Sequence, residues 1–288
     1  MKVLITGAGG QVGRMLIETR PPNAEVFACT HADLDIAAVD AVRDYVGRHR
    51  PDTIINAAAY TAVDKAESEA DAAQRINSEG PRYLAAAAGA VGARLIHIST
   101  DFVFDGTASS PYLPDSSTNP LSVYGRTKRD GELAVRELLP QRSAIVRTAW
   151  VYAAIGANFL RTMLRIMRAT GAVRVVADQV GTPTAARPFA EALWRIAASP
   201  EISGIHHWTD AGVASWYDFA VAIAEEGIVL GLLPAGIAVT PITTGDYPTP
   251  ARRPSYSVLD KRSLASYGLS PVHWRKRLRS VLKEIPGV

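Results

Sequence analysis

The chain has 288 residues, of which 48% are hydrophobic and 20% charged, and 31 Lys and Arg against 28 Asp and Glu give a net charge of +3. This composition is typical of a globular protein and excludes a disordered, collagen-like or low-complexity chain. Because the charge is small and the basic residues are scattered, we expect no nucleic-acid partner. The single cysteine, Cys29, excludes an internal disulfide or a multi-cysteine zinc site.

The apolar stretches are too short to cross a bilayer. The longest, at residues 84–93 and 228–239, fall well short of the ~18 residues required. Only three apolar residues follow Lys2 before Thr6, so the N-terminus lacks the pattern of a signal peptide. We therefore expect a cytoplasmic protein with no membrane partner.

In the first half of the chain, apolar runs alternate with helix-like segments. The runs lie at residues 3–5, 25–28, 53–56, 94–99 and 143–147, and the helix-like segments at 12–19, 37–49, 71–91 and 128–139. Strands that are apolar throughout and separated by helices predict a parallel sheet covered on both faces. The expected fold class is α/β, a doubly wound Rossmann-type parallel sheet.

After residue 150 the alternation becomes irregular. Helices are expected at 158–169, 189–198 and 216–226, with a strand at 173–177. Residues 241–254 contain four prolines and should be largely loop. We divide the chain into a Rossmann domain at 1–150 and a smaller C-terminal substrate-binding lobe at 151–288, allowing for segments that return to the first domain.

The first expected strand runs into a glycine-rich loop, GAGGQVG, at residues 7–13. Gly7 permits a tight turn, Gly10 lets the backbone approach a pyrophosphate, and Gly13 lets the helix pack closely on the strand. The helix then offers free N–H groups and its positive dipole end to the phosphates. A glycine loop between a strand and an amphipathic helix predicts a dinucleotide site, whereas the absence of a Gly-Lys-Ser/Thr loop excludes a P-loop nucleotidase.

The second expected strand ends in the sequence ACTH at residues 28–31, without a carboxylate. An acidic residue at this point would bond the adenosine ribose hydroxyls and repel a 2′-phosphate. Its absence favours NADPH, and NADH stays open because Asp33 and Asp35 follow closely.

Tyr124 and Lys128 are four residues apart, so they are expected on one face of a helix. A neighbouring ammonium group should lower the pKa of the phenol and make Tyr124 an effective proton donor to a developing alkoxide. Thr100 supports this interpretation, because it ends an expected strand where ligands meet an open α/β sheet. Its hydroxyl could bond the substrate carbonyl or the phenol.

The order of motifs along nearly the whole chain resembles that of the extended short-chain dehydrogenase/reductases, and more narrowly the dTDP-4-dehydrorhamnose reductase family. The matching segments are residues 7–13, 56–67, 99–106, 124–128, 147–152, 178–184 and 250–254. This resemblance implies NAD(P)H-dependent reduction of the C4 ketone of dTDP-4-dehydro-6-deoxy-L-mannose to dTDP-L-rhamnose. It makes Tyr124 the proton donor, Lys128 its partner and a cofactor anchor, and Thr100 the residue that tunes the tyrosine.

The resemblance also implies the residues that bind each ligand. The cofactor would be held by Gly7, Gly10, Gln11, Val12, Gly13, Thr30, Asp35, Ile36, Ala59, Tyr60, Thr61, Tyr124 and Lys128. The nucleotide sugar would contact Thr100, Asp101 and Trp150. From the residues themselves, a loop between prolines that offers the guanidinium groups of Arg252 and Arg253 suits a diphosphate.

The chain departs from related families at two positions. Phe102 follows Asp101 where the related dehydratases have a glutamate, so dehydration is not expected; the reductases usually have a tyrosine there. Met15 stands where some family members place a magnesium-binding glutamate at a dimer interface. No metal site is therefore expected, and the protein is expected to be a monomer or a homodimer.

Two alternatives stay open: a reductase of another nucleotide-linked 4-ketosugar, and a catalytically silent NAD(P)-binding regulatory subunit. For Thr61 and Asp64, a helix-capping role and a substrate role are equally open. The polar and aromatic residues expected to be structural are Cys29, Asn77, Asp105, His206, His207 and Trp216.

Overall fold

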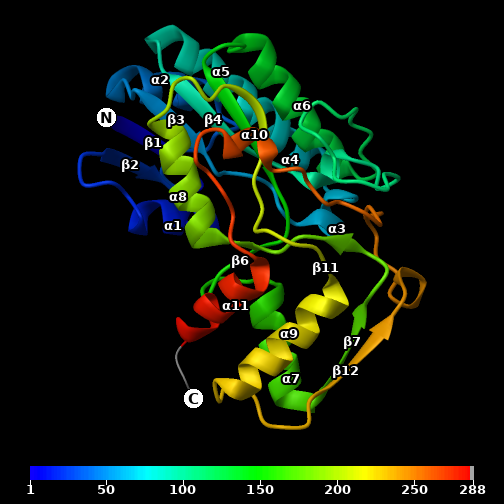
Figure 1. Ribbon diagram of the computed structural model, residues 1–288. Helices are drawn as coiled ribbons and strands as arrows, with labels where there is room; N and C mark the ends of the chain where they lie inside the picture. Colours follow the sequence, from blue (N-terminus) through cyan, green and yellow to red (C-terminus); the bar gives the residue numbers. More distant parts are fainter. Residues whose placement is uncertain (286–288) are drawn as a thin grey trace.

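Six parallel strands form the central sheet of the computed structural model, which describes residues 1–285 (Figure 1). They are β1 (Lys2–Thr6), β2 (Glu25–Cys29), β3 (Thr53–Asn56), β4 (Arg94–Thr100), β5 (Ser143–Thr148) and β10 (Gly204–His207). The strand order is β10-β5-β4-β3-β1-β2, with all neighbours parallel. The order reverses between β1 and β3, and ligands bind at such a switch point. The predicted doubly wound α/β fold is confirmed.

Helices cover both faces of this sheet, as the continuously apolar strands require. On one face lie α1 (Gln11–Glu18) and α8 (Ala186–Ala197); on the other lie α2 (Val39–His49), α5 (Gly80–Val91) and α6 (Val123–Leu138). Side chains alternate along β1: Ile5 packs into the cluster that holds Phe189 of α8, and Leu4 into the cluster that holds Leu84 of α5.

Two of the predicted helices differ from the observed ones. The segment predicted at 71–91 consists of α4 (Ala70–Gln74), a π-helical turn at Arg75–Glu79 and then α5. The helix predicted at 128–139 begins earlier, at Val123, because the Ser122 hydroxyl accepts a hydrogen bond from the Gly125 N–H and caps it. This cap places Tyr124 in the first turn of α6.

The smaller lobe lies below the sheet in Figure 1 and has its own apolar core. It contains α7 (Phe159–Thr170), β7 (Ala172–Val176), α9 (Trp216–Val229), β12 (Ala238–Ile242) and α11 (Trp274–Lys283). Short strands β6 (Val151–Tyr152), β8 (Val180–Gly181), β9 (Thr184–Ala185) and β11 (Ala214–Ser215), and short helices α3 (Val63–Ala66) and α10 (Arg262–Ala265), complete the fold.

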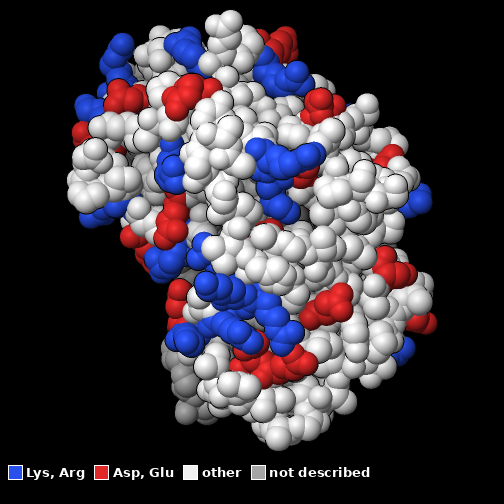
Figure 2. Space-filling model, viewed as in Figure 1, with Lys and Arg blue, Asp and Glu red and all other residues white. Residues whose placement is uncertain are grey.

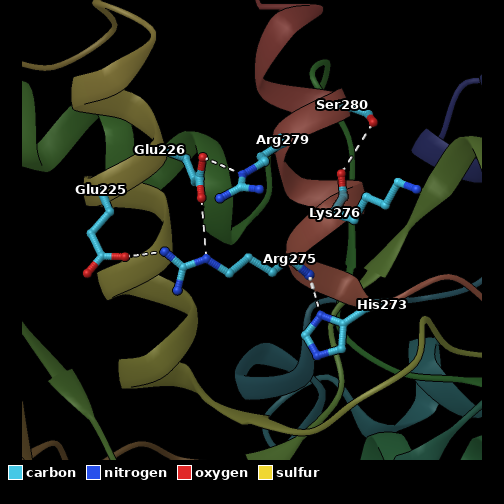
Figure 3. Close-up of polar contacts among 7 residues, drawn as sticks. All are labelled: Glu225, Glu226, His273, Arg275, Lys276, Arg279 and Ser280. Atoms are coloured by element: carbon cyan, nitrogen blue, oxygen red, sulfur yellow. Dashed lines mark hydrogen bonds and ion pairs between the residues drawn. The ribbon is translucent and has the colours of Figure 1, made fainter.

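Ion pairs join α9 to α11 in this lobe (Figure 3). The Arg279 Nε atom donates to Glu226 Oε2 at 2.7 Å, the Arg275 Nε atom donates to Glu226 Oε1 at 3.3 Å, and Arg275 also pairs with Glu225. Figure 2 shows basic side chains gathered over α11 next to acidic ones. Arg275 and Arg279 are therefore paired within the lobe.

Residues 186–207 return from the C-terminal half to the first lobe. Helix α8 packs on α1, and β10 adds the sixth strand beside β5. The division of the chain into domains at residue 150, with returning segments, remains a prediction.

Candidate active site

A cavity of about 900 Å³ lies at the carboxyl ends of the central strands, and both lobes line it. Its wall is formed by the segments that follow β1, β2, β3, β4 and β5, by α6, and by Trp216 and Arg253 of the C-terminal half. The parallel sheet brings these segments together because all its strands end at the same edge.

The glycine loop forms one end of the cavity. Gly7 has a φ of 72°, and a Cβ atom there would lie 2.5 Å from the Ala58 nitrogen. A Cβ on Gly13 would lie 2.2 Å from the Gly7 carbonyl oxygen, so only glycine allows α1 to pack this close to β1. Helix α1 begins after Gly10 without a side-chain cap, which leaves N–H groups of its first turn available to an anion.

Two carboxylates, those of Asp33 and Asp35, lie in the segment that follows β2. Asp33 is the nearer of the two in sequence, and its Oδ2 atom accepts hydrogen bonds from the Thr30 N–H (2.9 Å) and hydroxyl (2.7 Å). These bonds hold the pKa of Asp33 below its usual value. They also keep the carboxylate within the loop that follows β2. Asp35 lines the cavity, and its Oδ1 atom accepts from the Ala37 N–H.

Lys128 is buried in the floor of the cavity, where its Nζ atom donates to the Ile98 carbonyl oxygen at 2.7 Å. The His97 Nε2 atom lies 3.4 Å from the same nitrogen. Burial lowers the pKa of Lys128 to about 8, and the negative charge of Glu132, one turn along α6, opposes this change.

Tyr124 lies one turn before Lys128 on α6 and lines the same cavity. Burial raises the pKa of Tyr124 to about 12; the Thr100 hydroxyl opposes this change and the Asp101 carboxylate adds to it. The expected acidification of the phenol by Lys128 is therefore not found, since the amine bonds the Ile98 carbonyl and desolvation dominates. Tyr124 carries its proton at neutral pH.

Thr100 and Asp101 end β4 next to this phenol. The Thr100 hydroxyl donates to Asp101 Oδ1 at 3.0 Å and accepts from the Phe102 N–H at 3.2 Å. Burial raises the pKa of Asp101 to about 6, and its Oδ2 atom has no hydrogen-bond partner among residues 1–285. The Phe102 ring meets the Tyr124 ring edge to face, with centroids 5.6 Å apart.

Trp150 lines the cavity in a strained conformation, with a φ of 47°. A bulky side chain rarely adopts this region, and such strain clusters at ligand sites. Its ring stacks on that of Trp216 of α9, with centroids 3.6 Å apart and planes 9° from parallel. Trp216 packs against the apolar core of the smaller lobe, as expected of a structural residue, and also lines the cavity with Trp150.

The proline-rich loop contributes one of its two arginines. Arg253 lines the cavity, and its guanidinium donates to both oxygens of Asp64, at 3.0 and 2.7 Å. Arg252 is exposed and does not line the cavity. Asp64 thus fixes the loop, and neither Thr61 nor Asp64 caps α3, which has no side-chain cap.

Tyr60 does not line the cavity, and its hydroxyl donates to Glu69 Oε2 at 2.6 Å. Its main chain is held by buried Asn77, whose amide accepts from the Tyr60 N–H (2.8 Å) and donates to the Tyr60 carbonyl (3.1 Å). Asn77 also donates to the Thr127 hydroxyl on α6. It lies in the π-helical turn and positions residues 59–61 along the cavity.

Comparisons with known proteins agree with this geometry. The family model described as the RmlD substrate binding domain matches residues 1–286. A dTDP-4-dehydrorhamnose reductase from Aggregatibacter actinomycetemcomitans is 41% identical over 288 residues, covering 97% of this chain and 98% of that one. The chain belongs to the RmlD family.

Solved structures of RmlD-type reductases superpose closely on the chain. A dTDP-4-dehydrorhamnose reductase from Clostridium acetobutylicum has a TM-score of 0.93 at 42% identity and covers 99% of both chains. The enzyme from Bacillus anthracis, solved in complex with NADP, has a TM-score of 0.92 at 35% identity and covers 98% of this chain and 99% of that one. The predicted family is confirmed.

Most of the residues predicted for the RmlD site line one cavity. These are Gly7, Gly10, Gln11, Val12, Thr30, Asp35, Ile36, Ala59, Thr61, Thr100, Asp101, Tyr124, Lys128, Trp150 and Arg253. Gly13, Tyr60 and Arg252 do not line it.

Sequence reasoning missed the segment at residues 156–158. Gly156 lines the cavity with a φ of 74°, and the Asn158 amide donates to Gln11 Oε1 at 2.8 Å. The second lobe therefore touches the glycine loop directly. The only signal was a glycine in a loop before an expected helix, which does not reveal what it contacts.

The structure offers no metal cluster within its described part: no three His, Cys, Asp or Glu side chains of residues 1–285 are grouped to bind an ion. Met15 is buried in α1, and its thioether offers no oxygen ligand. Across the same residues, no helix combines the length and apolar character needed to span a bilayer.

Proposed function

We propose that the chain reduces the C4 ketone of dTDP-4-dehydro-6-deoxy-L-mannose to dTDP-L-rhamnose with NADPH, or with NADH. The observation that carries this proposal is a single cavity lined by the glycine loop at one end and by Thr100, Tyr124 and Lys128 at the other. Relatives that align over 97% and 96% of the chain include two dTDP-4-dehydrorhamnose reductases. The predicted enzyme class, an NAD(P)H-dependent oxidoreductase, is in agreement with them.

The residues present fit a nicotinamide dinucleotide. A Cβ on Gly10 would have open space around it except for the Gly7 oxygen at 3.4 Å, so a phosphate can approach the backbone. Asp33 does not line the cavity but Asp35 does, so the segment after β2 leaves both NADPH and NADH open. When bound, the cofactor supplies the hydride that reduces the ketone carbon.

Tyr124 supplies the proton. A phenol with a pKa of about 12 is fully protonated at neutral pH, as a donor must be. The ketone oxygen gains negative charge during the reaction and then takes the proton from the Tyr124 Oη atom. Lys128, fixed to the Ile98 carbonyl, lines the same cavity and offers further N–H donors, whereas the Thr100 hydroxyl hydrogen is already donated to Asp101.

The same site lacks the second carboxylate needed to eliminate water. Asp101 is followed by Phe102, whose ring packs on Tyr124 and has no proton to exchange. Reduction is therefore favoured over dehydration. We assign Trp150 and Trp216 to the face against which the nucleotide sugar binds, because their stacked rings line the cavity between the lobes.

Tyr124→Phe tests the assignment. We expect an unchanged fold and NADPH affinity with kcat lower by about 10² to 10⁴, the usual contribution of a positioned acid. NADPH oxidation with dTDP-4-dehydro-6-deoxy-L-mannose measures kcat, and fluorescence titration measures cofactor binding. A variant with wild-type turnover would refute Tyr124 as the donor.

A panel of nucleotide-linked 4-ketosugars separates the alternatives. The proposal expects the highest kcat/KM with the dTDP-linked L-sugar. A higher kcat/KM with another ketosugar would make that sugar nucleotide the substrate instead. NADPH binding without turnover of any member of the panel would favour a silent subunit. The cytoplasmic location and the monomeric or homodimeric state remain part of the proposal.

A further inference from the structure

Three polar side chains lie in a row across the sheet behind Lys128. Thr6 of β1 is in register with Asn56 of β3, and Asn56 is in register with His97 of β4. In-register residues of parallel strands face the same side, here the side covered by α6. All three are completely buried, so each of their polar atoms depends on its neighbours in the row.

The hydrogen bonds fix the orientation of the Asn56 amide. Its Oδ1 atom accepts from the Ala58 N–H at 3.1 Å and from the Thr6 hydroxyl at 2.7 Å. A backbone N–H can only donate, so this atom is the oxygen and the other is the NH₂ group. The NH₂ group lies 3.0 Å from His97 Nδ1, which must therefore accept. A neutral imidazole with an accepting Nδ1 carries its hydrogen on Nε2.

This Nε2–H group lies 3.4 Å from Lys128 Nζ. A neutral amine has a lone pair that can accept such a hydrogen, whereas an ammonium group has only donors. The amine also donates to the Ile98 carbonyl at 2.7 Å, so two of its directions are set by β4. The polar environment behind Lys128 thus matches the neutral amine better than the ammonium ion.

Other groups around Lys128 do not remove this preference. On its own helix, Tyr124 is neutral and Glu132 is paired at 2.9 and 2.6 Å with Arg147 of β5. Burial and the nearby lysine hold the pKa of His97 well below its usual range, so its ring stays uncharged. Burial lowers the pKa of Lys128 in the same direction, to about 8.

We propose that His97 is a positioning residue for Lys128. Locked by Asn56 as the Nε2–H tautomer, it holds the Lys128 amine against β4 and weakens its hold on the third proton. Lys128 is thereby held in place one helical turn from Tyr124. The inference rests on the proposed role of Lys128 in the reaction.

The tautomer is tested on the wild-type protein without cofactor. The chain has six histidines, so ¹⁵N-histidine labelling gives a spectrum in which His97 can be assigned by side-chain correlations. We expect a neutral ring with hydrogen on Nε2 from about pH 5 to 9. A hydrogen on Nδ1, or a charged ring at neutral pH, would overturn the proposal.

The effect on Lys128 is tested with His97→Gln and ¹³Cε-lysine labelling, with the Lys128 signal assigned by its loss in Lys128→Met. The Gln carbonyl can turn toward the amine and accept from an ammonium group, so the pKa of Lys128 should rise by about one unit. His206→Gln is the matched control, because His206 is a buried strand histidine bonded to the Ser203 carbonyl and the Ser263 hydroxyl. It should leave Lys128 unchanged.

An unchanged pKa of Lys128 in folded His97→Gln would refute the proposal. Both measurements are made without cofactor or turnover. A chain that reduces no ketosugar could still show the expected His97 tautomer and Lys128 pKa. An active reductase could lack them. The failure of this inference and the failure of the proposed function are therefore distinguishable.

Discussion

Desolvation governs the charges at the reaction end of the cavity. Lys128 and Asp101 are each 2% exposed, and burial moves each pKa toward neutrality, to about 8 and about 6 respectively. The pKa of Tyr124 rises, whereas the spacing of Tyr124 to Lys128 predicted that it would fall. Burial disfavours the charged form of each group, so it raises the pKa of the two acids and lowers that of the lysine.

Asp101 makes stability depend on pH. Its raised pKa means that the folded protein binds this proton more tightly than the unfolded chain between about pH 4 and 6, so the free energy of unfolding falls as pH rises through that window. Asp101→Asn mimics the protonated acid. It should match the wild type near pH 4 and exceed it by about 3 kcal/mol near pH 7. Urea unfolding at both pH values measures this, and a difference independent of pH would contradict it.

The buried ion pair of Glu132 and Arg147 should be costly to break, because both side chains are only 3% exposed. Glu132→Gln leaves an uncompensated guanidinium and is expected to lower the free energy of unfolding by about 3–5 kcal/mol. Glu137→Gln, on the same helix, is the matched control, since Glu137 and its partner Arg82 are exposed. Its cost should stay below about 1 kcal/mol in the same chemical unfolding experiment. Equal costs would show that burial does not set the strength of the pair.

At the level of elements, α1 is placed by its contact with the strand before it. Gly13 lies against the Gly7 carbonyl with no room for a methyl group. The N-terminus of α1 is consequently held at the edge of the sheet, where its first N–H groups meet the cavity.

Gly13→Ala should displace α1 and weaken NADPH binding by more than about tenfold, with a loss of stability of a few kcal/mol. Gly47→Ala serves as control: Gly47 is within α2 and a Cβ there would meet nothing within 4 Å. That variant should gain about 0.5–1 kcal/mol and bind NADPH normally. Fluorescence titration measures NADPH affinity, and thermal unfolding measures stability. Normal NADPH binding by Gly13→Ala would show that the position of α1 does not determine the phosphate site.

On the scale of the whole molecule, the cavity exists because two lobes meet along it. Two contacts join the lobes: Trp150 stacks on Trp216, and Asn158 bonds Gln11. A third, the ion pair of Arg253 with Asp64, fixes the proline-rich loop beside the cavity. The glycine loop belongs to the first lobe alone, whereas the stacked tryptophans come from both sides. Cofactor and sugar sites should therefore respond differently to changes in the second lobe.

Trp216→Leu removes the stacked ring that supports Trp150. We expect KM for the nucleotide sugar to rise by about tenfold, as a lost aromatic pair would suggest, with NADPH affinity changed less than about twofold. Steady-state kinetics and cofactor titration separate the two effects. A parallel loss of NADPH affinity would mean that the second lobe shapes the whole cavity.

The pattern of residues predicted the parallel sheet and five of its six strands, because runs that are apolar throughout can only be buried on both faces; β10, which comes from the C-terminal half, was not expected in the sheet. The glycine loop and the Tyr124–Lys128 spacing were predicted as local patterns, and the family was predicted from the order of motifs along nearly the whole chain. The sequence could not reveal that Arg252 is exposed while Arg253 pairs with Asp64, or that Trp216 reaches the cavity. Nor could spacing show that the pKa of Tyr124 rises. Those outcomes depend on burial and on partners distant in the chain, which only the packed tertiary structure supplies.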